Sequence, residues 1–297
     1  MNQEFRGCLE IFIGAAVWGT IGIFVTAMDQ AGSTVAMTAV LRMVFTALLM
    51  LTAAVLHSGW SSLRISKRSL FFCALLGLTC NGLCNITYNL AIIQTGVALG
   101  AVMLNTSPIF ASIMAALFFK ETFSARKILA LALNVLGCVL AVTGGHIGTL
   151  EVPLVGILNG ILSGFMYGLT PILVKFVGNG CNVFVMGTYA DIVATGVLML
   201  WENPFAGVGM GALSPKILLW GFLYALLPTF FSYAIYTLGV QKIRETSKVP
   251  VIASVETLSA VLLGMAIYGE KVSLAQWLGI VIIFLSIGLM NKKEVRR

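Results

Sequence analysis

Four ionisable residues lie inside long apolar stretches of the sequence: Glu10 lies near the end of its stretch, and Arg42, Asp191 and Glu256 lie deeper. If these stretches cross a membrane, a charge at the centre of a helix costs about 2.5–3.5 kcal/mol, so such residues usually serve ion pairing, binding or proton transfer. Arg42 could hold a substrate carboxylate by two parallel hydrogen bonds, or form a structural pair with Asp191. Glu256 could bind an ammonium group, exchange a proton, or be a hydrogen-bonded structural acid. We expect Glu256 and Arg42 to bind opposite ends of a zwitterion.

Aromatic and amide side chains form a second group of candidates. Asn81, Asn85 and Tyr88 are spaced i, i+4 and i+7, which places them on one face of a helix. Such a face could line a polar cavity that suits a ring or a cation, although each residue alone could equally serve packing. The predicted substrate-binding residues are Trp18, Arg42, Asn81, Asn85, Tyr88, Asn105, Tyr167, Asp191, Tyr233, Tyr236 and Glu256, and Glu256 is also the candidate for proton coupling.

Four prolines, Pro108, Pro171, Pro228 and Pro250, lie in or at the start of apolar stretches. Proline is tolerated in membrane helices where neighbouring groups or a wet cavity satisfy the freed backbone. We predict that these prolines mark gating kinks, with ordinary bends as the alternative.

The sequence contains few residues that could bind a metal ion or catalyse a reaction. Cys80 and Cys84 are four residues apart and could hold a soft metal, but small cysteines in apolar stretches favour packing. Only two histidines are present, His57 and His146, and neither lies near a nucleophile in a recognisable arrangement. We therefore predict no catalytic residues, no metal site, no cofactor and no enzymatic activity.

The composition indicates the kind of structure in which these residues lie. Of the 297 residues, 59% are hydrophobic and 10% are charged, whereas soluble domains carry about 25% charged residues. Ten stretches are long and apolar enough to span a bilayer. They lie at residues 8–28, 34–57, 70–93, 96–119, 126–145, 154–177, 183–201, 217–240, 248–268 and 273–291.

The basic residues predict an orientation. With the N-terminus in the cytoplasm, Lys216 and Lys271 fall outside, Arg42 falls within a span, and the other 15 of the 18 Lys and Arg residues fall on the cytoplasmic side. Cytoplasmic loops carry such an excess of positive charge, so both termini are predicted to be cytoplasmic. This pattern also explains the net charge of +7 without a nucleic-acid partner.

The two halves of the chain match at an offset of 149 residues. Arg42 then falls on Asp191, Trp18-Gly19 on Tyr167-Gly168, and Glu121 on Glu270. Five spans per copy is an odd number, so the second copy must enter the membrane from the opposite side. Inverted repeats are a recurrent architecture of secondary transporters, with the substrate site near the midplane. We place the repeats at 1–147 and 148–297.

The sequence resembles the EamA-type members of the drug/metabolite transporter superfamily. The shared features are Trp18-Gly19, Leu41-Arg42, Pro108 and an acidic residue before the fifth helix of each half, Glu121 and Glu270. Thr257 replaces the proline expected in the second half, and Asp191 replaces its arginine. The resemblance implies an all-α membrane protein of ten helices in two inverted repeats, with relatives that carry amino acids, nucleotide sugars, vitamins or toxic organic compounds.

These features predict a secondary transporter of small organic metabolites, amino acids or related zwitterionic or aromatic compounds, working by alternating access around a midplane cavity. Export is implied by the resemblance. The protein is expected to be a multi-pass protein of the cell (inner or plasma) membrane of a bacterium, as a monomer or homodimer. The alternatives are a proton-coupled exporter of organic cations or drugs and, more remotely, an intramembrane enzyme or a lipid flippase.

Overall fold

The computed structural model describes residues 3–146, 153–201, 203–204, 213–269 and 271–291, and all regular elements in these ranges are helices. Ten helical segments of this part are long and apolar enough to cross a membrane, and no boundary differs from its prediction by more than five residues. The segments are Gln3–Gln30, Val35–Ser58, Lys67–Thr95, Leu99–Phe119, Ala125–Thr143, Leu154–Val177, Val183–Trp201, Pro215–Lys242, Lys248–Ile267 and Leu274–Asn291. The predicted repeat boundary at 147/148 lies outside the described residues.

Five of the ten spans are built from more than one helix. The broken spans are α1 (Gln3–Trp18) with α2 (Ile21–Gln30), α4 (Lys67–Leu76) with α5 (Cys84–Thr95), α6 (Val97–Leu104) with α7 (Ser107–Phe119), α11 (Pro215–Tyr224) with α12 (Ser232–Lys242), and α13 (Lys248–Ala253) with α14 (Val255–Tyr268). The continuous spans are α3 (Val35–Ser58), α8 (Ala125–Thr143), α9 (Leu154–Val177), α10 (Val183–Trp201) and α15 (Leu274–Asn291).

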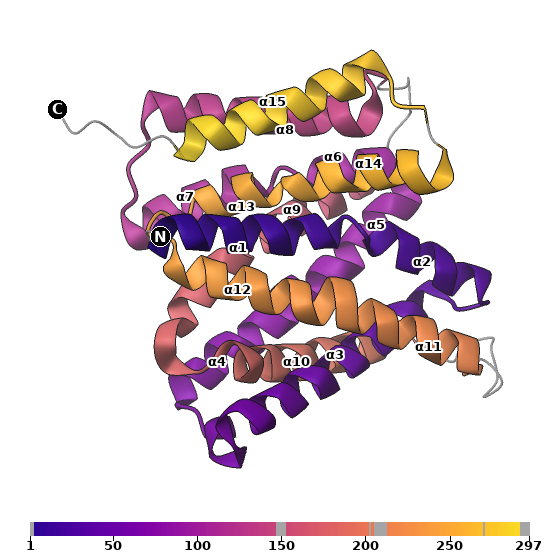
Figure 1. Cartoon of the computed structure of the whole chain (residues 1–297), viewed down its shortest axis with the longest axis vertical. Helices are drawn as coiled ribbons and strands as arrows, with labels where there is room; N and C mark the ends of the chain where they lie inside the picture. The colour runs from indigo at the N-terminus through magenta and orange to yellow at the C-terminus, as the bar shows by residue number, and fades with distance from the viewer. Residues whose placement is uncertain (1–2, 147–152, 202, 205–212, 270, 292–297) are drawn as a thin grey trace.

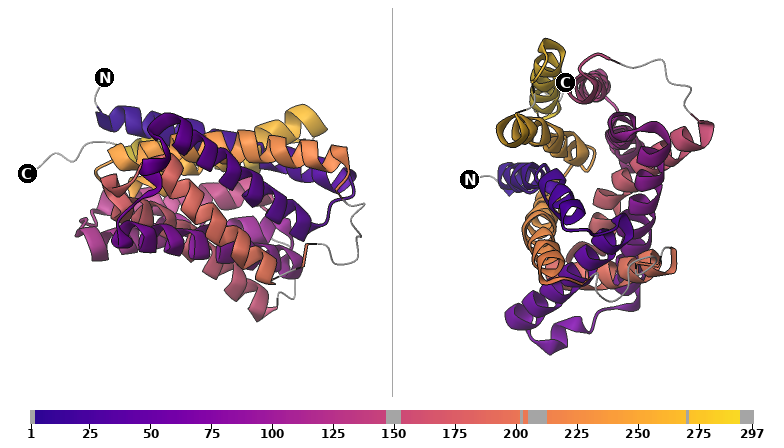
Figure 2. Two further views of the ribbon diagram at one scale, coloured as in Figure 1. Left: turned by 90° about the horizontal axis from the view of Figure 1, so that it is seen from below. Right: turned by 90° about the vertical axis from the view of Figure 1, so that its right-hand side faces the viewer.

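The helices run broadly side by side, and α1 begins at the same end of the bundle at which α15 ends (Figures 1 and 2). We call this end, with the loops 59–66, 120–124, 178–182 and 243–247, the terminal face, and the other end the opposite face. Large apolar side chains cover the outer surface: Leu200 is 90% exposed and Leu56 is 82% exposed. Contiguous apolar surface of this kind suits lipid rather than water.

The packing repeats between the halves. Helix α1 packs against α12 and, equivalently, α9 packs against α5, while α3 pairs with α10 and α8 with α15 (Figure 1). The interruptions repeat as well, because π-helical segments occupy Gly77–Leu83 and Ala225–Phe231. The left-handed residues Lys120 (φ 54°) and Gly269 (φ 66°), which end α7 and α14, are 149 positions apart.

The prolines relate to the interruptions in different ways. Pro228 lies within the second π-helical segment, and Pro108 follows the break between α6 and α7, in the first turn of α7, where its missing N–H is tolerated. Pro250 lies in the first turn of α13, and the break comes later, at Ser254. Helix α9 continues through Pro171. At Pro171 and Pro250, therefore, the helix is not interrupted at the proline, and the gating kinks stay a prediction.

Glycines allow the closest helix contacts. Gly156, Gly160, Gly164 and Gly168 form one face of α9 and pack against residues of α5, α6 and α7 from Gln94 to Ala111. Gly77, the first residue of the first π-helical segment, lies so close to the backbone of Ala190 in α10 that an added Cβ would overlap its carbonyl oxygen. Small residues bring membrane helices together in this way.

A buried polar group joins three spans. The side-chain nitrogen of Asn134, in α8, donates to the hydroxyls of Ser254 (2.7 Å) and Ser286 (3.1 Å), and Asn134 is fully buried. Ser254 is also the residue at the break between α13 and α14. The amide of Asn134 thus holds this break in place.

Replacing Asn134 with leucine should destabilise the bundle modestly. Interhelical hydrogen bonds in membranes are worth about 0.6 kcal/mol on average and about 1.7 kcal/mol at most, so losing two should lower the free energy of unfolding by about 1–3 kcal/mol. Thermal unfolding in detergent measures this loss. Thr52→Val is the control because the Thr52 hydroxyl bonds only its own helix. Equal melting temperatures for N134L and T52V would contradict the assigned role.

Candidate functional site

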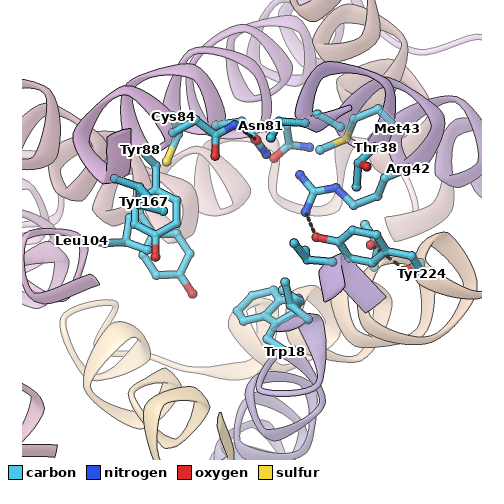
Figure 3. A pocket seen from close by; sticks show the side chains of 18 of the residues that line it. Trp18, Thr38, Arg42, Met43, Asn81, Cys84, Tyr88, Leu104, Tyr167 and Tyr224 are labelled. Atoms are coloured by element: carbon cyan, nitrogen blue, oxygen red, sulfur yellow. Dashed lines mark hydrogen bonds between the residues drawn. The ribbon is translucent and has the colours of Figure 1, made fainter. Parts of the chain in front are cut away.

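A cavity of about 580 Å³ lies between the two halves (Figure 3). Trp18, Tyr167 and Glu256 line it in the middle of their spans, and Ser33 and Val35 line it at the loop between α2 and α3. Val35 is 64% exposed. The cavity therefore runs from midspan to the opposite face of the bundle. Its volume falls within the range of about 300–1,000 Å³ typical of small-molecule sites.

Nine of the eleven predicted binding residues line this cavity. The other two, Tyr236 and Asn105, are not among the described residues that line it, and a binding role for them stays a prediction. Tyr236 is 2% exposed and packs behind Trp18, with the ring centroids 4.7 Å apart. Asn105 donates to the carbonyl of Ala101 (2.9 Å) and accepts from Thr257 (3.4 Å), so its side chain serves the break between α6 and α7. The nine lining residues are Trp18, Arg42, Asn81, Asn85, Tyr88, Tyr167, Asp191, Tyr233 and Glu256.

Arg42, in α3, is held on one side of the cavity by Tyr224. One terminal nitrogen of its guanidinium donates to the Tyr224 hydroxyl (3.2 Å), and the guanidinium carbon lies 5.2 Å from the centre of the Tyr224 ring. The buried Nε of Arg42 has no hydrogen-bond partner among the described residues. We call the guanidinium edge formed by Nε and the second terminal nitrogen the free edge of Arg42. Nε is buried, whereas the end of the guanidinium points into the cavity, where it can donate to an anionic group (Figure 3).

Asp191, in α10, does not form an ion pair with Arg42. One carboxylate oxygen accepts from the side-chain nitrogen of Asn81 (2.9 Å), and the other has no partner among the described residues. Helices α3 and α10 pack together, and the charge of Arg42 acts on Asp191 without a contact within 4.0 Å. The structural pair considered from the sequence is thus absent in this conformation, and each residue keeps unused hydrogen-bonding capacity.

Glu256 lies at an aromatic part of the cavity. The Tyr167 hydroxyl donates to one of its carboxylate oxygens (3.0 Å), and Trp18 lies beside Tyr167 with ring centroids 6.2 Å apart. Figure 3 places Tyr167 and Tyr88 across the cavity from Arg42. A carboxylate among aromatic faces suits a cationic group.

Other lining residues escaped the sequence analysis. Asn89 is four residues after Asn85 and extends the same helical face, so the spacing could have revealed it. Asp29 stands at the end of the first span and was overlooked. Tyr224, which also stacks on Phe24 at 5.9 Å, is 182 residues from Arg42, and no local pattern links the two.

Ion pairs close the terminal face. Lys242, in α12, contacts both carboxylate oxygens of Glu10, in α1, at 2.5 and 2.6 Å, and Lys248 contacts Glu4 at 3.4 Å. These four residues form what we call the terminal lock. None of the terminal-face loops within the described residues lines the cavity.

Glu245 lies beside this lock, outside the spans, and contacts Lys127 at 2.8 Å and Lys248 at 3.6 Å. Its partial burial acts to raise the pKa, but the hydrogen bonds and charges of the two lysines outweigh burial and lower the pKa of Glu245 below its ordinary value. Glu245 is therefore ionised at neutral pH.

The model of the EamA-like transporter family matches this chain twice, over residues 5–143 and 154–292. The chain belongs to the EamA-like transporter family. The two EamA matches begin 149 residues apart, at 5 and 154, which is the offset at which the halves were aligned from their residues. The predicted resemblance, the ten-span fold and the two copies are thereby confirmed.

Two similar proteins are also named as transporters. An "uncharacterized transporter" of Archaeoglobus fulgidus is 26% identical over 273 residues, covering 92% of each chain. The "uncharacterized inner membrane transporter YicL" of Salmonella typhimurium is 23% identical over 316 residues, covering 100% of this chain and 99% of its own. A solved crystal structure shares the fold, with a TM-score of 0.80 at 13% identity and 96% of each chain covered. This EamA member is therefore a multi-pass membrane transporter and not an enzyme.

Proposed function

We propose that this transporter carries small zwitterionic metabolites, amino acids or related aromatic compounds, by alternating access around the cavity. The observation that supports this is the unpaired state of Arg42 and Asp191 beside one another at the same cavity. Unpaired charges in a membrane are costly, and each retains a free atom for hydrogen bonding. A bound zwitterion would neutralise both, with its carboxylate on the free edge of Arg42 and its ammonium on Asp191.

We propose export as the direction of transport, which the family resemblance supports, and the basic residues suggest how the chain is oriented. Basic residues gather in the loops of the terminal face, so we infer that this face is cytoplasmic. The cavity reaches the opposite face while the terminal lock is closed, which makes this conformation outward-facing. The export direction further requires a state in which the terminal lock opens and the opposite face closes.

A second candidate is a proton-coupled exporter of organic cations. It is favoured by Glu256, which lies among Trp18, Tyr88 and Tyr167 without a basic partner. In that case Arg42 would have no ligand to bind.

Transport by purified protein in proteoliposomes distinguishes the two. We expect counterflow of amino acids, and we expect Arg42→Ala to lower their apparent affinity about 10- to 100-fold, because a hydrogen bond to a charged group is worth about 1.5–3 kcal/mol. Arg64→Ala, in an exposed loop of the terminal face, is the control and should transport normally. Uptake of organic cations alone, unchanged in R42A, would refute the zwitterion proposal and favour the second candidate.

A further inference from the structure

We propose that the substrate carries two cationic groups and one carboxylate, as in the dibasic amino acids lysine and ornithine, with the distal ammonium bound at Glu256. This inference rests on the proposed function and narrows it to one substrate class.

The charges lining the cavity support a substrate with an additional positive charge. Arg42 is the single basic residue among the described lining residues, whereas Asp29, Asp191 and Glu256 are acidic. A neutral amino acid would match Arg42 and Asp191 and leave Glu256 without an opposite charge. A dibasic amino acid supplies one carboxylate and two ammonium groups, which match Arg42, Asp191 and Glu256 in turn.

The positions of these residues fit one elongated ligand. Arg42 and Tyr224 stand on one side of the cavity, and Tyr167, which donates to Glu256, stands on the other (Figure 3). Asn81 lies between them in this view and binds Asp191. The Arg42 guanidinium and the Tyr167 hydroxyl that binds Glu256 therefore lie on opposite sides of the cavity, and Asp191 is bound by a residue that lies between them in this view.

The surroundings of Glu256 are suited to an ammonium group. Among the described residues, a hydrogen bond reaches only one of its carboxylate oxygens, from Tyr167, and no basic residue forms an ion pair with it. The rings of Trp18, Tyr88 and Tyr167 line the same part of the cavity. Aromatic faces attract a desolvated cation, and they also favour the methylene groups that precede a distal ammonium.

Binding to the purified full-length protein tests this inference with two matched ligands. Lysine and norleucine differ in the distal ammonium, so their affinities isolate the contribution of Glu256. We expect lysine to bind at least tenfold more tightly than norleucine, measured by thermal shift and by competition in proteoliposome counterflow. In Glu256→Gln, lysine should weaken to the affinity of norleucine, while norleucine should bind as it does to the unmodified protein. Norleucine binding also shows that the variant is folded.

The outcomes separate this inference from the proposed function. Equal affinity for lysine and norleucine, with Glu256→Gln changing neither, would overturn the dibasic substrate and leave the zwitterion proposal standing. Binding of cadaverine, a diamine without a carboxylate, as tightly as lysine would overturn both, because Arg42 would then have no role. Loss of norleucine binding in Glu256→Gln would also overturn the inference, since Glu256 would then bind the amino group common to all amino acids.

Discussion

Replacing Gly77 with valine is expected to abolish the folded transporter. Gly77 stands against the backbone of Ala190 in α10, and even a Cβ at this position would overlap the Ala190 carbonyl. Backbone atoms cannot move aside as a flexible side chain can, so α4 and α10 would have to separate. That separation would also displace Asn81 from Asp191, because both lie within four residues of the contact.

Expression of a fluorescent fusion followed by size-exclusion chromatography measures this effect. We expect a monodisperse peak for the unmodified protein, a strongly reduced peak for Gly77→Ala and none for Gly77→Val. Gly196→Val is the matched control, because Gly196 lies in α10 and an added Cβ there would meet no atom within 4 Å. A normal peak for G77V would show that the close contact is not required.

Reversing the charge of Lys242 should remove both transport and much of the stability. Lys242 and Glu10 join α12 to α1 with side chains only 23% and 15% exposed. Lys242→Glu places two carboxylates in contact there. Breaking a buried pair costs about 3–5 kcal/mol, and this partly exposed pair should fall at the lower end of that range.

The double variant Glu10→Lys/Lys242→Glu is the decisive comparison. It restores opposite charges across the α1–α12 contact, so melting temperature and transport should both recover toward the unmodified values. Recovery of stability without recovery of transport would mean that the lock also contributes side-chain geometry to gating. Failure of both to recover would contradict the pairing of Glu10 with Lys242 as the basis of the effect.

The spans were predictable because the signal for them is strong. A stretch of about 20 apolar residues has few alternatives in a chain with 10% charged residues, and the concentration of Lys and Arg in alternate gaps supports the number of crossings. The interruptions were harder to predict. Pro108 marks the break before α7. The equivalent break, at Ser254, has no proline beside it; there the side chain of Asn134, in another helix, donates a hydrogen bond to Ser254. Such a contact leaves no local trace in the sequence.

The candidate site was predictable where helical spacing and a shared face coincide. Asn85 and Tyr88 lie in α5 as expected, whereas Asn81 lies in the π-helical segment, where the spacing assumed for it does not hold. It still lines the cavity. Tyr233 and Tyr236 show the limit of spacing, since one lines the cavity and the other packs behind Trp18. Which of two neighbouring positions faces a cavity depends on helices that are distant in sequence.

The break after Trp18 distinguishes the first span from α9, the helix at the equivalent position in the second half. The first span is divided into α1 and α2 at Gly19-Thr20, while its counterpart α9 passes through Tyr167-Gly168 without interruption. The first span shows the divided shape and α9 shows the continuous shape. If the two halves exchanged conformations, each helix would take the shape of the other. If the two halves exchange shapes during transport, we expect α9 to be divided near Gly168, the first span to be continuous, and the cavity to open at the terminal face. The difference between these two equivalent helices therefore indicates the shape that each should take in the alternative conformation.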